Sequence, residues 1–461
     1  MTGGPLQGWS ATQLLAAYQA RQLSPVEVLD AVLRHIEACE PQLHALYAFD
    51  PDSARQQARA SEARWLKGQA LPLDGLPLTL KENIATRGTP LPLGTAATEL
   101  IPATEDAPPA ARLREAGAVL MAKTTMPDYG MLSSGLSSFH PLSRNPWDLS
   151  KNPGGSSAGA AAAAAAGYGP LHVGTDIGGS LRLPAGWCGI FTLKPSGGRI
   201  PIKPAYAGRV AGPMTRTVAD AALMMRELSR PDWRDATSLP PQALDWQIRP
   251  TPLKGLKLGL MLDAGWGMAV DPEVAAAVRD AAQRFAAAGA QVEPLAGFST
   301  RTMIEGLDKF WRMRSWLDFC KLPAERQALV LPYIRAWVET AAGLSAAELF
   351  EGYSQMAAFR EAAVAACEPF DYVLSPVSPV PAFAAEWASP LNDPTRPFEH
   401  IAFTLPFNMS EQPAASINCG YTAAGLPIGL QIIGKRFDDV GVLGLAAAFE
   451  QLRAPQRAWP L

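Results

Sequence analysis

The chain has 461 residues, of which 48% are hydrophobic and 18% are charged, and its 40 basic and 43 acidic side chains leave a formal net charge of −3. This is the composition of an ordinary globular protein that can bury a sizeable core. The charge is nearly balanced and no block of consecutive Lys or Arg occurs, so nucleic acid is not expected as a primary partner.

The sequence shows no signal for membranes, disulfides or metals. Its first residues lack a basic segment followed by an apolar one, and no later window has the pattern of a membrane span. Five scattered cysteines form no CxxC pair, and five histidines show no ligand spacing such as HExxH. We therefore expect a soluble, cytoplasmic protein without membrane partner, metal or cofactor, whose cysteines are reduced and buried.

Residues 1–70 predict an outer layer of helices. Apolar residues spaced near 3.6 indicate helices over 11–22, 26–39 and 53–68, and a serine precedes each of the first two. After residue 75 the pattern changes to short apolar runs that alternate with a helical segment, which is typical of an α/β sheet.

The second half of the chain repeats this alternation. A strand at 257–262, a helix at 271–290 and a strand at 291–295 predict one strand–helix–strand unit. The stretch 300–366 is helical and rich in Trp and Leu, so it is either ordinary core or a cover over a substrate cleft. Further strands and a final helix over 440–452 follow, and we expect one continuous domain over 1–461 because no long linker interrupts it.

The segment around residue 156 has the character of a functional site. The sequence GGSSAG directly precedes seven alanines at 160–166, and Ala has the highest helix propensity, so Ser156 or Ser157 is expected at a helix N-terminus. The free N–H groups and the positive dipole end of that first turn favour an anion or a hydrogen-bonded serine.

A further serine, Ser180, follows two glycines in the sequence GTDIGGS. Successive N–H groups of such a turn can converge on one point and form an oxyanion hole, although an isolated GGS is usually a plain turn. Residues 155–159 also match the GxSxG pattern of a nucleophile elbow, which would make Ser157 the nucleophile and leave His400 as the late histidine, but no clear acid motif precedes His400.

Lys81 ends the apolar run GLPLTLK. A lysine at a strand end is normally a solvated charge. If it is buried, its pKa falls and the neutral amine can take a proton from a serine, as in Ser-Lys enzymes.

Together these segments resemble the amidase signature hydrolases over nearly the whole chain. The separations between Lys81, Ser156 and Ser180 match those of the family. The sequence blocks that carry the resemblance are GLPLTLKEN, LREAGAVLMAKTTMPDYG, RNPWDLS, GGSSAGAAAAAAAG, GTDIGGSLRLPAGWCGIFTLKPSGGRIP, GPMTRTVADAALMM and PFNMSEQPAASINCGYTAAGLPIGLQIIGKRFDD.

The resemblance implies a three-layer α/β/α fold with a large mixed sheet, a signature core over 75–230 and a helical embellishment near the cleft over 300–366. It also implies a Ser-Ser-Lys triad with Ser180 as nucleophile, Ser156 as bridging serine and Lys81 as base, and a cis peptide bond before Ser156. The family's oxyanion-hole donors correspond to the N–H groups of Ile177, Gly178, Gly179 and Ser180. Its supporting positions correspond to Ser157, Thr175, Asp176 and Arg182. Ala158 departs from the family's usual SSGG, which we expect to tighten packing without touching the triad.

The resemblance leaves the substrate open. We expect Met126, Tyr129, Met131 and Leu132, together with Trp187 and Ile190, to build an apolar site for hydrophobic or aryl amides, or else to be ordinary core. Carbamates present a similar carbonyl, so urethane cleavage is a second option. The alternative function is that of the glutamine-hydrolysing A subunit in a tRNA-dependent amidotransferase complex, which needs polar contacts to glutamine and a partner chain. A homodimer is also left open.

Overall fold

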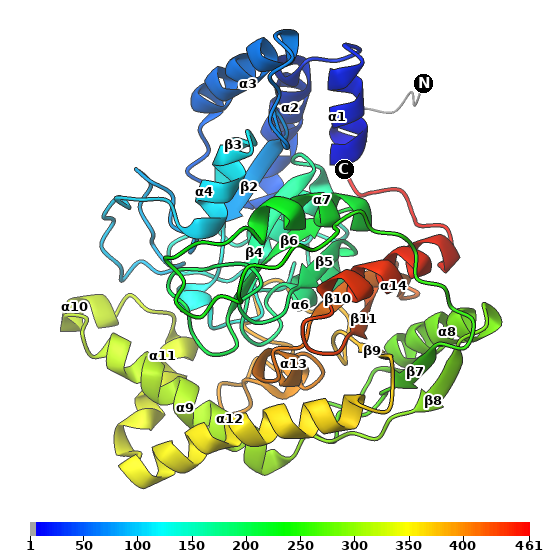
Figure 1. Ribbon diagram of the computed structural model, residues 1–461. Helices are drawn as coiled ribbons and strands as arrows, with labels where there is room; N and C mark the ends of the chain where they lie inside the picture. The colour runs from blue at the N-terminus through cyan, green and yellow to red at the C-terminus, as the bar shows by residue number, and fades with distance from the viewer. Residues whose placement is uncertain (1–5) are drawn as a thin grey trace.

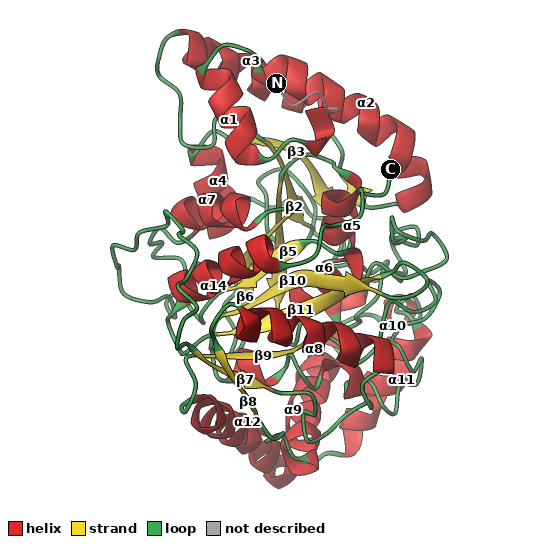
Figure 2. Cartoon of the chain, turned by 90° about the vertical axis from the view of Figure 1, so that its right-hand side faces the viewer, coloured by secondary structure: helices red, strands yellow, loops and turns green. Residues whose placement is uncertain are grey.

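The computed structural model describes residues 6–461, so the first five residues of the predicted helical layer lie outside the described range. A mixed sheet of 11 strands forms the centre of the molecule, and helices cover both of its faces (Figures 1 and 2). The predicted fold class, an α/β/α arrangement with a large mixed sheet, is confirmed. The assignment of the whole chain to one domain stays a prediction.

The N-terminal helices form the layer that the sequence predicts, at the top of Figure 1. They are α1 (Ala11–Gln19), α2 (Pro25–Leu43) and α3 (Pro51–Leu66). Ser10 and Ser24 each cap a helix through a capping box, in which the serine accepts a hydrogen bond from the third residue and the side chain of that residue bonds back.

The strand order of the sheet brings distant segments together. In spatial order the strands are β1 (Leu46–Tyr47), β3 (Val119–Thr124), β2 (Pro77–Lys81), β4 (Leu171–Asp176), β6 (Val210–Thr215), β5 (Phe191–Lys194), β10 (Ala414–Tyr421), β11 (Pro427–Ile433), β9 (Tyr372–Pro376), β7 (Lys257–Leu260) and β8 (Gln291–Pro294). β2 pairs in parallel with β3 and β4, and β7 pairs in parallel with β8 and β9, whereas the other pairs are antiparallel.

The parallel pair β2–β4 positions the candidate site. Leu80 lies opposite Val173 in the register of this pair. Because parallel strands end at the same edge of a sheet, Lys81 at the end of β2 comes next to the end of β4. Neither β4 nor its neighbour β6 was predicted, because both lie in segments whose Gly and Pro residues indicate turns.

Helices pack on both faces of the sheet. One apolar core lies under α4 (Pro108–Glu115), α7 (Val218–Leu228), α8 (Pro272–Ala287) and α14 (Asp439–Leu452). Further apolar clusters contain α5 (Ala158–Ala166) and α6 (Arg182–Cys188). Every residue of α5 is buried, since a helix with only methyl and hydrogen side chains can approach the strands closely.

The Trp-rich stretch forms a group of helices at the bottom of Figure 1. These are α9 (Arg301–Phe319), α10 (Ala324–Gln327), α11 (Pro332–Val338) and α12 (Ala346–Cys367), and α12 packs along α9. The short elements that remain are α13 (Pro406–Met409), η1 (Leu6–Gly8), η2 (Asp128–Gly130), η3 (Glu339–Gly343) and η4 (Glu399–Ile401).

Two further expectations can be compared with the structure. The strand–helix–strand unit β7–α8–β8 is present with its two strands parallel, as predicted. The expectation that all cysteines are buried is wrong for Cys320, which lies exposed at the end of α9, while the other four are buried. Within residues 6–461 no helix combines the length and the apolar character that a membrane crossing requires.

Candidate active site

Lys81 is fully buried at the end of β2, and its amine contacts three hydroxyl groups. Nζ lies 2.8 Å from Ser156 Oγ, 3.1 Å from Ser157 Oγ and 3.1 Å from Thr175 Oγ1. The structure therefore brings together four of the residues that the sequence analysis singled out, from β2, from the start of α5 and from β4.

The environment of Lys81 disfavours its charged form. Burial, and to a smaller extent the positive charge of Arg209, lower the pKa of this amine to about 7, although the negative charges of Asp176 and Glu82 oppose the shift. Near neutral pH a substantial fraction of Lys81 is therefore a neutral amine with a free lone pair.

The two adjacent serines have different surroundings. The peptide bond between Gly155 and Ser156 is cis, as the resemblance implies, and Ser157 is the N-cap residue of α5. The Ser157 hydroxyl donates to the carbonyl oxygen of Thr175 at 3.1 Å, whereas Ser156 Oγ has no hydrogen-bond partner other than Lys81 in the described part of the chain.

Asp176 organises the glycine-rich loop that follows β4. Its carboxylate accepts hydrogen bonds from the amides of Gly179 at 2.7 Å and Leu181 at 3.0 Å. Arg182 donates to both of its oxygens, each at 3.1 Å, and also to the Gln431 side chain at 2.8 Å. Asp176 and Arg182 are fully buried, and this pairing holds the pKa of Asp176 well below its usual range. The charged pair thus fixes the loop that carries Ser180.

The loop geometry requires glycine. Gly179 has φ of +129°, and a Cβ there would approach Thr404 Oγ1 to 2.5 Å. The sequence analysis expected the Gly179 amide to be an oxyanion-hole donor, but this amide already donates to Asp176 and is not free for a substrate. The amides of the other three predicted donors form no hydrogen bond to any of residues 6–461; they are Ile177, Gly178 and Ser180.

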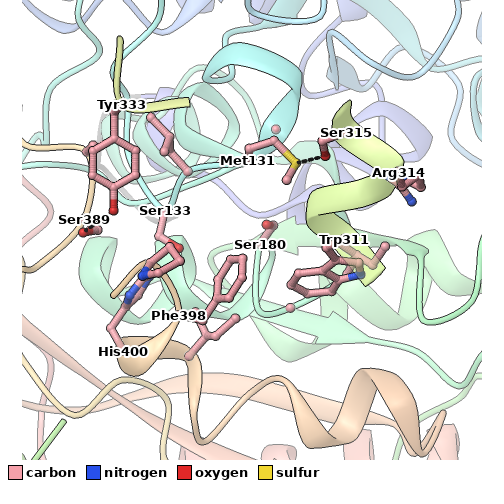
Figure 3. Close-up of a pocket in the computed structure, with 17 residues that line it drawn as sticks. Met131, Ser133, Ser180, Trp311, Arg314, Ser315, Tyr333, Ser389, Phe398 and His400 are labelled. Carbon is pink, nitrogen blue, oxygen red and sulfur yellow. Dashed lines mark hydrogen bonds between the residues drawn. The ribbon is translucent and has the colours of Figure 1, made fainter. Parts of the chain in front are cut away.

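Ser180 lies where two cavities meet. We call the first the aromatic pocket; its walls include Leu132, Trp311, Tyr333, Phe398, His400 and Ile401. Figure 3 shows Ser180 in this pocket, between Trp311 and the wall that carries His400. We call the second the charged pocket; its walls include Ser156, Thr175, Lys203, Tyr206, Arg209 and Asp318.

The predicted pocket residues divide into two groups. Met126 and Tyr129 line the charged pocket, Leu132 lines the aromatic pocket and Met131 lines both. Trp187 and Ile190 line neither: Trp187 packs against Phe383, and Ile190 packs in the cluster of the alanine helix. For these two residues the structure favours the alternative that the sequence analysis left open, ordinary core.

The geometry also bears on the expected contact between Ser156 and Ser180 and on the nucleophile elbow at Ser157. No hydrogen bond joins Ser156 to Ser180 among the described residues, so the two serines share a cavity without direct contact in this state. Ser157 is fully buried and lines neither pocket, which argues against the nucleophile elbow.

The structure adds site residues that sequence reasoning missed. Asn83 donates to Thr175 Oγ1 at 3.1 Å, and its position two residues after Lys81 was the available signal. Phe398 lines the aromatic pocket from a segment without a recognisable motif. His400 lines it too, although the sequence analysis considered this residue only as the late histidine of a nucleophile elbow. Of the tryptophans considered as a cover, Trp311 lines the aromatic pocket, whereas Trp337 is buried against Phe398.

Comparisons with known proteins point to one family. A sequence model described as Amidase matches residues 27–443. The chain is 36% identical over 469 residues to the A subunit of glutamyl-tRNA(Gln) amidotransferase from Myxococcus xanthus (strain DK1622), and the match covers 95% of this chain and 96% of that relative.

Solved structures are also similar over nearly the full length. The crystal structure of a bacterial aryl acylamidase of the amidase signature family has a TM-score of 0.90 and 29% identity, with 97% of both chains covered. A 6-aminohexanoate cyclic dimer hydrolase, solved with its substrate, has a TM-score of 0.88 and 25% identity, with 98% of both chains covered.

Proposed function

Because this chain belongs to the amidase signature family and is thus a hydrolase acting on C–N bonds, we propose that it cleaves amides with hydrophobic or aryl groups, and aryl carbamates, through an acyl-enzyme. The observation that carries this proposal is the buried Lys81, whose amine is hydrogen-bonded to Ser156. Ser156 lines the charged pocket, and Ser180 lines both this pocket and the aromatic pocket.

The hydrogen bonds around Lys81 direct its lone pair toward Ser156. A neutral amine has two hydrogens and one lone pair for the three hydroxyls that it contacts. The Ser157 hydroxyl donates its hydrogen to the Thr175 carbonyl oxygen, and the Thr175 hydroxyl donates its hydrogen to Asn83 Oδ1 at 3.5 Å. Both oxygens therefore accept from the amine, which leaves the lone pair to receive the hydrogen of Ser156. Lys81 is thereby the base for Ser156.

The reaction follows from this arrangement. Ser156 gives its proton to Lys81 and takes the proton of Ser180, after the Ser180 side chain has turned toward it on substrate binding. The Ser180 oxygen then attacks the carbonyl carbon. The amides of Ile177, Gly178 and Ser180 receive the negative charge on the carbonyl oxygen, and one such donor typically contributes about 10²- to 10³-fold in rate.

The position of Ser156 determines which pocket binds each half of the substrate. Ser156 must return a proton to the leaving nitrogen, and Ser156 lines the charged pocket but not the aromatic one. The leaving amine therefore lies in the charged pocket, and the acyl group lies in the aromatic pocket. Water then enters from the side of the departed amine and hydrolyses the acyl-enzyme.

The substrate preference follows from the apolar side chains. Trp311 and Phe398 pack edge to face with ring centroids 5.3 Å apart, and Leu132 and Ile401 add further apolar surface. An aromatic acyl group buries this surface, which a small aliphatic acyl group cannot do. The likeness to an aryl acylamidase supports the same choice.

The test is a matched series of substrates given to the purified protein alone. We expect phenylacetyl anilide and a phenyl carbamate to exceed acetamide and glutamine by more than about a hundredfold in kcat/KM, since each methylene in such a pocket contributes about 1–3 kcal/mol. Equal rates for phenylacetyl anilide and acetamide would contradict the proposed substrate class.

The second candidate function is glutamine hydrolysis within an amidotransferase complex. The 36% identity to the A subunit of such an enzyme favours it, and so do charges in the charged pocket. Arg209 and Arg314 lie over the Tyr206 ring, at 5.0 and 4.4 Å from its centroid, and neither forms an ion pair with a described residue. They offer contacts for a carboxylate, and Asp318 on the same wall offers one for an ammonium group.

The two candidates differ in their dependence on a partner. The amidase proposal requires full turnover of aryl amides by the isolated chain. Glutamine preferred over every aryl amide, or activity that appears only after addition of partner subunits, would establish the second candidate instead.

A further inference from the structure

One wall of the aromatic pocket is polar. Ser133, Tyr333, Ser389 and His400 lie on this wall, and Trp311 lies across the cavity from them (Figure 3). We call these four residues the polar wall. The hydroxyl oxygens of Tyr333 and Ser389 share a hydrogen bond of 3.2 Å, and the Tyr333 hydroxyl also donates to the Asp393 carbonyl oxygen at 2.9 Å.

The other two members of the wall have no such partners. His400 is only 3% exposed, and its Nε2 is buried without a hydrogen bond to any of residues 6–461. No hydrogen bond within the described range involves the Ser133 hydroxyl either. An unpaired buried polar group is costly, so His400 Nε2 is suited to meet a polar part of a bound molecule. Ser133 is half-buried, and its hydroxyl is available to the same molecule.

The charge state of His400 narrows the chemistry of that molecule. Burial lowers the pKa of His400 to about 3, so its ring is neutral at physiological pH and presents one donor and one acceptor nitrogen. A neutral hydroxyl group complements Nε2 in either tautomer, because it can donate to a bare nitrogen or accept from an N–H. An anionic group would find no cation on the polar wall, since Arg314 lines the pocket from the opposite helix α9 (Figure 3).

We propose that the aromatic pocket selects an acyl group whose ring carries a neutral hydroxyl, and that His400 and Ser133 are the residues that determine this specificity. The inference rests on the proposed function, in which Ser180 is acylated and the acyl group occupies the aromatic pocket. The aromatic ring then packs against Trp311 and Phe398, and its hydroxyl reaches the polar wall.

The test compares two anilides that differ by one hydroxyl on the acyl side. The purified enzyme should hydrolyse 4-hydroxyphenylacetyl anilide at least about tenfold faster in kcat/KM than phenylacetyl anilide, as expected for a buried group that gains a hydrogen bond. A hydroxyl moved to the aniline ring should give less than about twofold preference, because the leaving amine occupies the other pocket.

Variants assign the preference to the polar wall. His400→Ala and Ser133→Ala should each reduce the tenfold ratio to about threefold or less, whereas His400→Gln, which keeps a donor and an acceptor, should retain part of it. His44→Asn is the matched control, since His44 lies at the end of α2 and Asn tolerates its positive φ of 50°, and it should leave the ratio unchanged.

A binding measurement keeps this inference separate from the proposed reaction. In the inactive variant Ser180→Ala, calorimetry should show 4-hydroxyphenylacetamide binding at least about tenfold more tightly than phenylacetamide. Turnover of both anilides with equal kcat/KM would overturn the hydroxyl subsite and leave the amidase proposal standing. Absence of turnover for every amide, together with the tenfold binding preference, would overturn the amidase proposal and leave the hydroxyl subsite standing. A ratio unchanged in both His400→Ala and Ser133→Ala would also overturn the inference.

Discussion

The protonation state of Lys81 gives the most detailed prediction. Its pKa of about 7 lies far below the ordinary lysine value of 10.5, and this difference corresponds to about 5 kcal/mol in favour of the neutral form. The reaction requires the neutral amine, so activity is lost as the pH falls through 7. We expect kcat/KM to fall about tenfold per pH unit below that value and to reach about one hundredth of its plateau at pH 5.

The assay measures kcat/KM for an aryl anilide between pH 5 and 9, because this substrate has no group that titrates in that range. Arg209→Gln provides the internal check. It removes a positive charge that lowers the pKa of Lys81, so the acid limb should move to higher pH, whatever happens to the plateau. The reasoning is refuted by a rate that does not change between pH 5 and 7, or by a limb that stays in place in Arg209→Gln.

The remaining predictions concern stability and specificity. Asp176→Asn should lower the free energy of unfolding by about 3–5 kcal/mol in urea denaturation, because it leaves the guanidinium of Arg182 buried without its counter-charge; a loss below about 1 kcal/mol would contradict this. Lys194 is buried with its pKa lowered to about 7 by burial, so between pH 7.5 and 9.5 the unfolded chain holds one more proton there and stability rises with pH. Lys194→Met should therefore flatten the pH dependence of unfolding by up to about 1.4 kcal/mol per pH unit, and an identical slope in both proteins would argue against the lowered pKa. Trp311→Ala should reduce kcat/KM for aryl amides at least about tenfold and for acetamide much less, whereas equal losses would mean that Trp311 does not contact the acyl group.

Local patterns in the sequence predicted several of the helices. The capping serines Ser10 and Ser24 and the 3.6-residue apolar spacing identified the first helices, and the alanine run identified α5. Strands β4 and β6 were not predicted, because Gly174 lies within β4 and Pro213 lies within β6. Tertiary pairing in the centre of a sheet overrides the turn preference of such residues.

The candidate site was predictable where it depended on nearby residues and not where it depended on distant ones. The resemblance located Lys81 and Ser156, and the structure shows them in contact. The partners of Arg182 could not be predicted, because Asn408 and Gln431 come from segments more than 200 residues away and reach it only through the order of the strands. The Trp-rich stretch stayed ambiguous for the same reason.

Labelling of the nucleophile tests the central claim most directly. The purified protein is treated with an aryl phosphonate that reacts with activated serines, and the peptides are mapped by mass spectrometry. We predict a single adduct on Ser180, distinguished from Ser156 and Ser157 by fragmentation of the labelled peptide, formed more slowly at pH 5 than at pH 8, and no adduct in the folded variant Ser180→Ala. An adduct on Ser157, or undiminished labelling of Ser180→Ala, would contradict the assignment of Ser180 as the nucleophile.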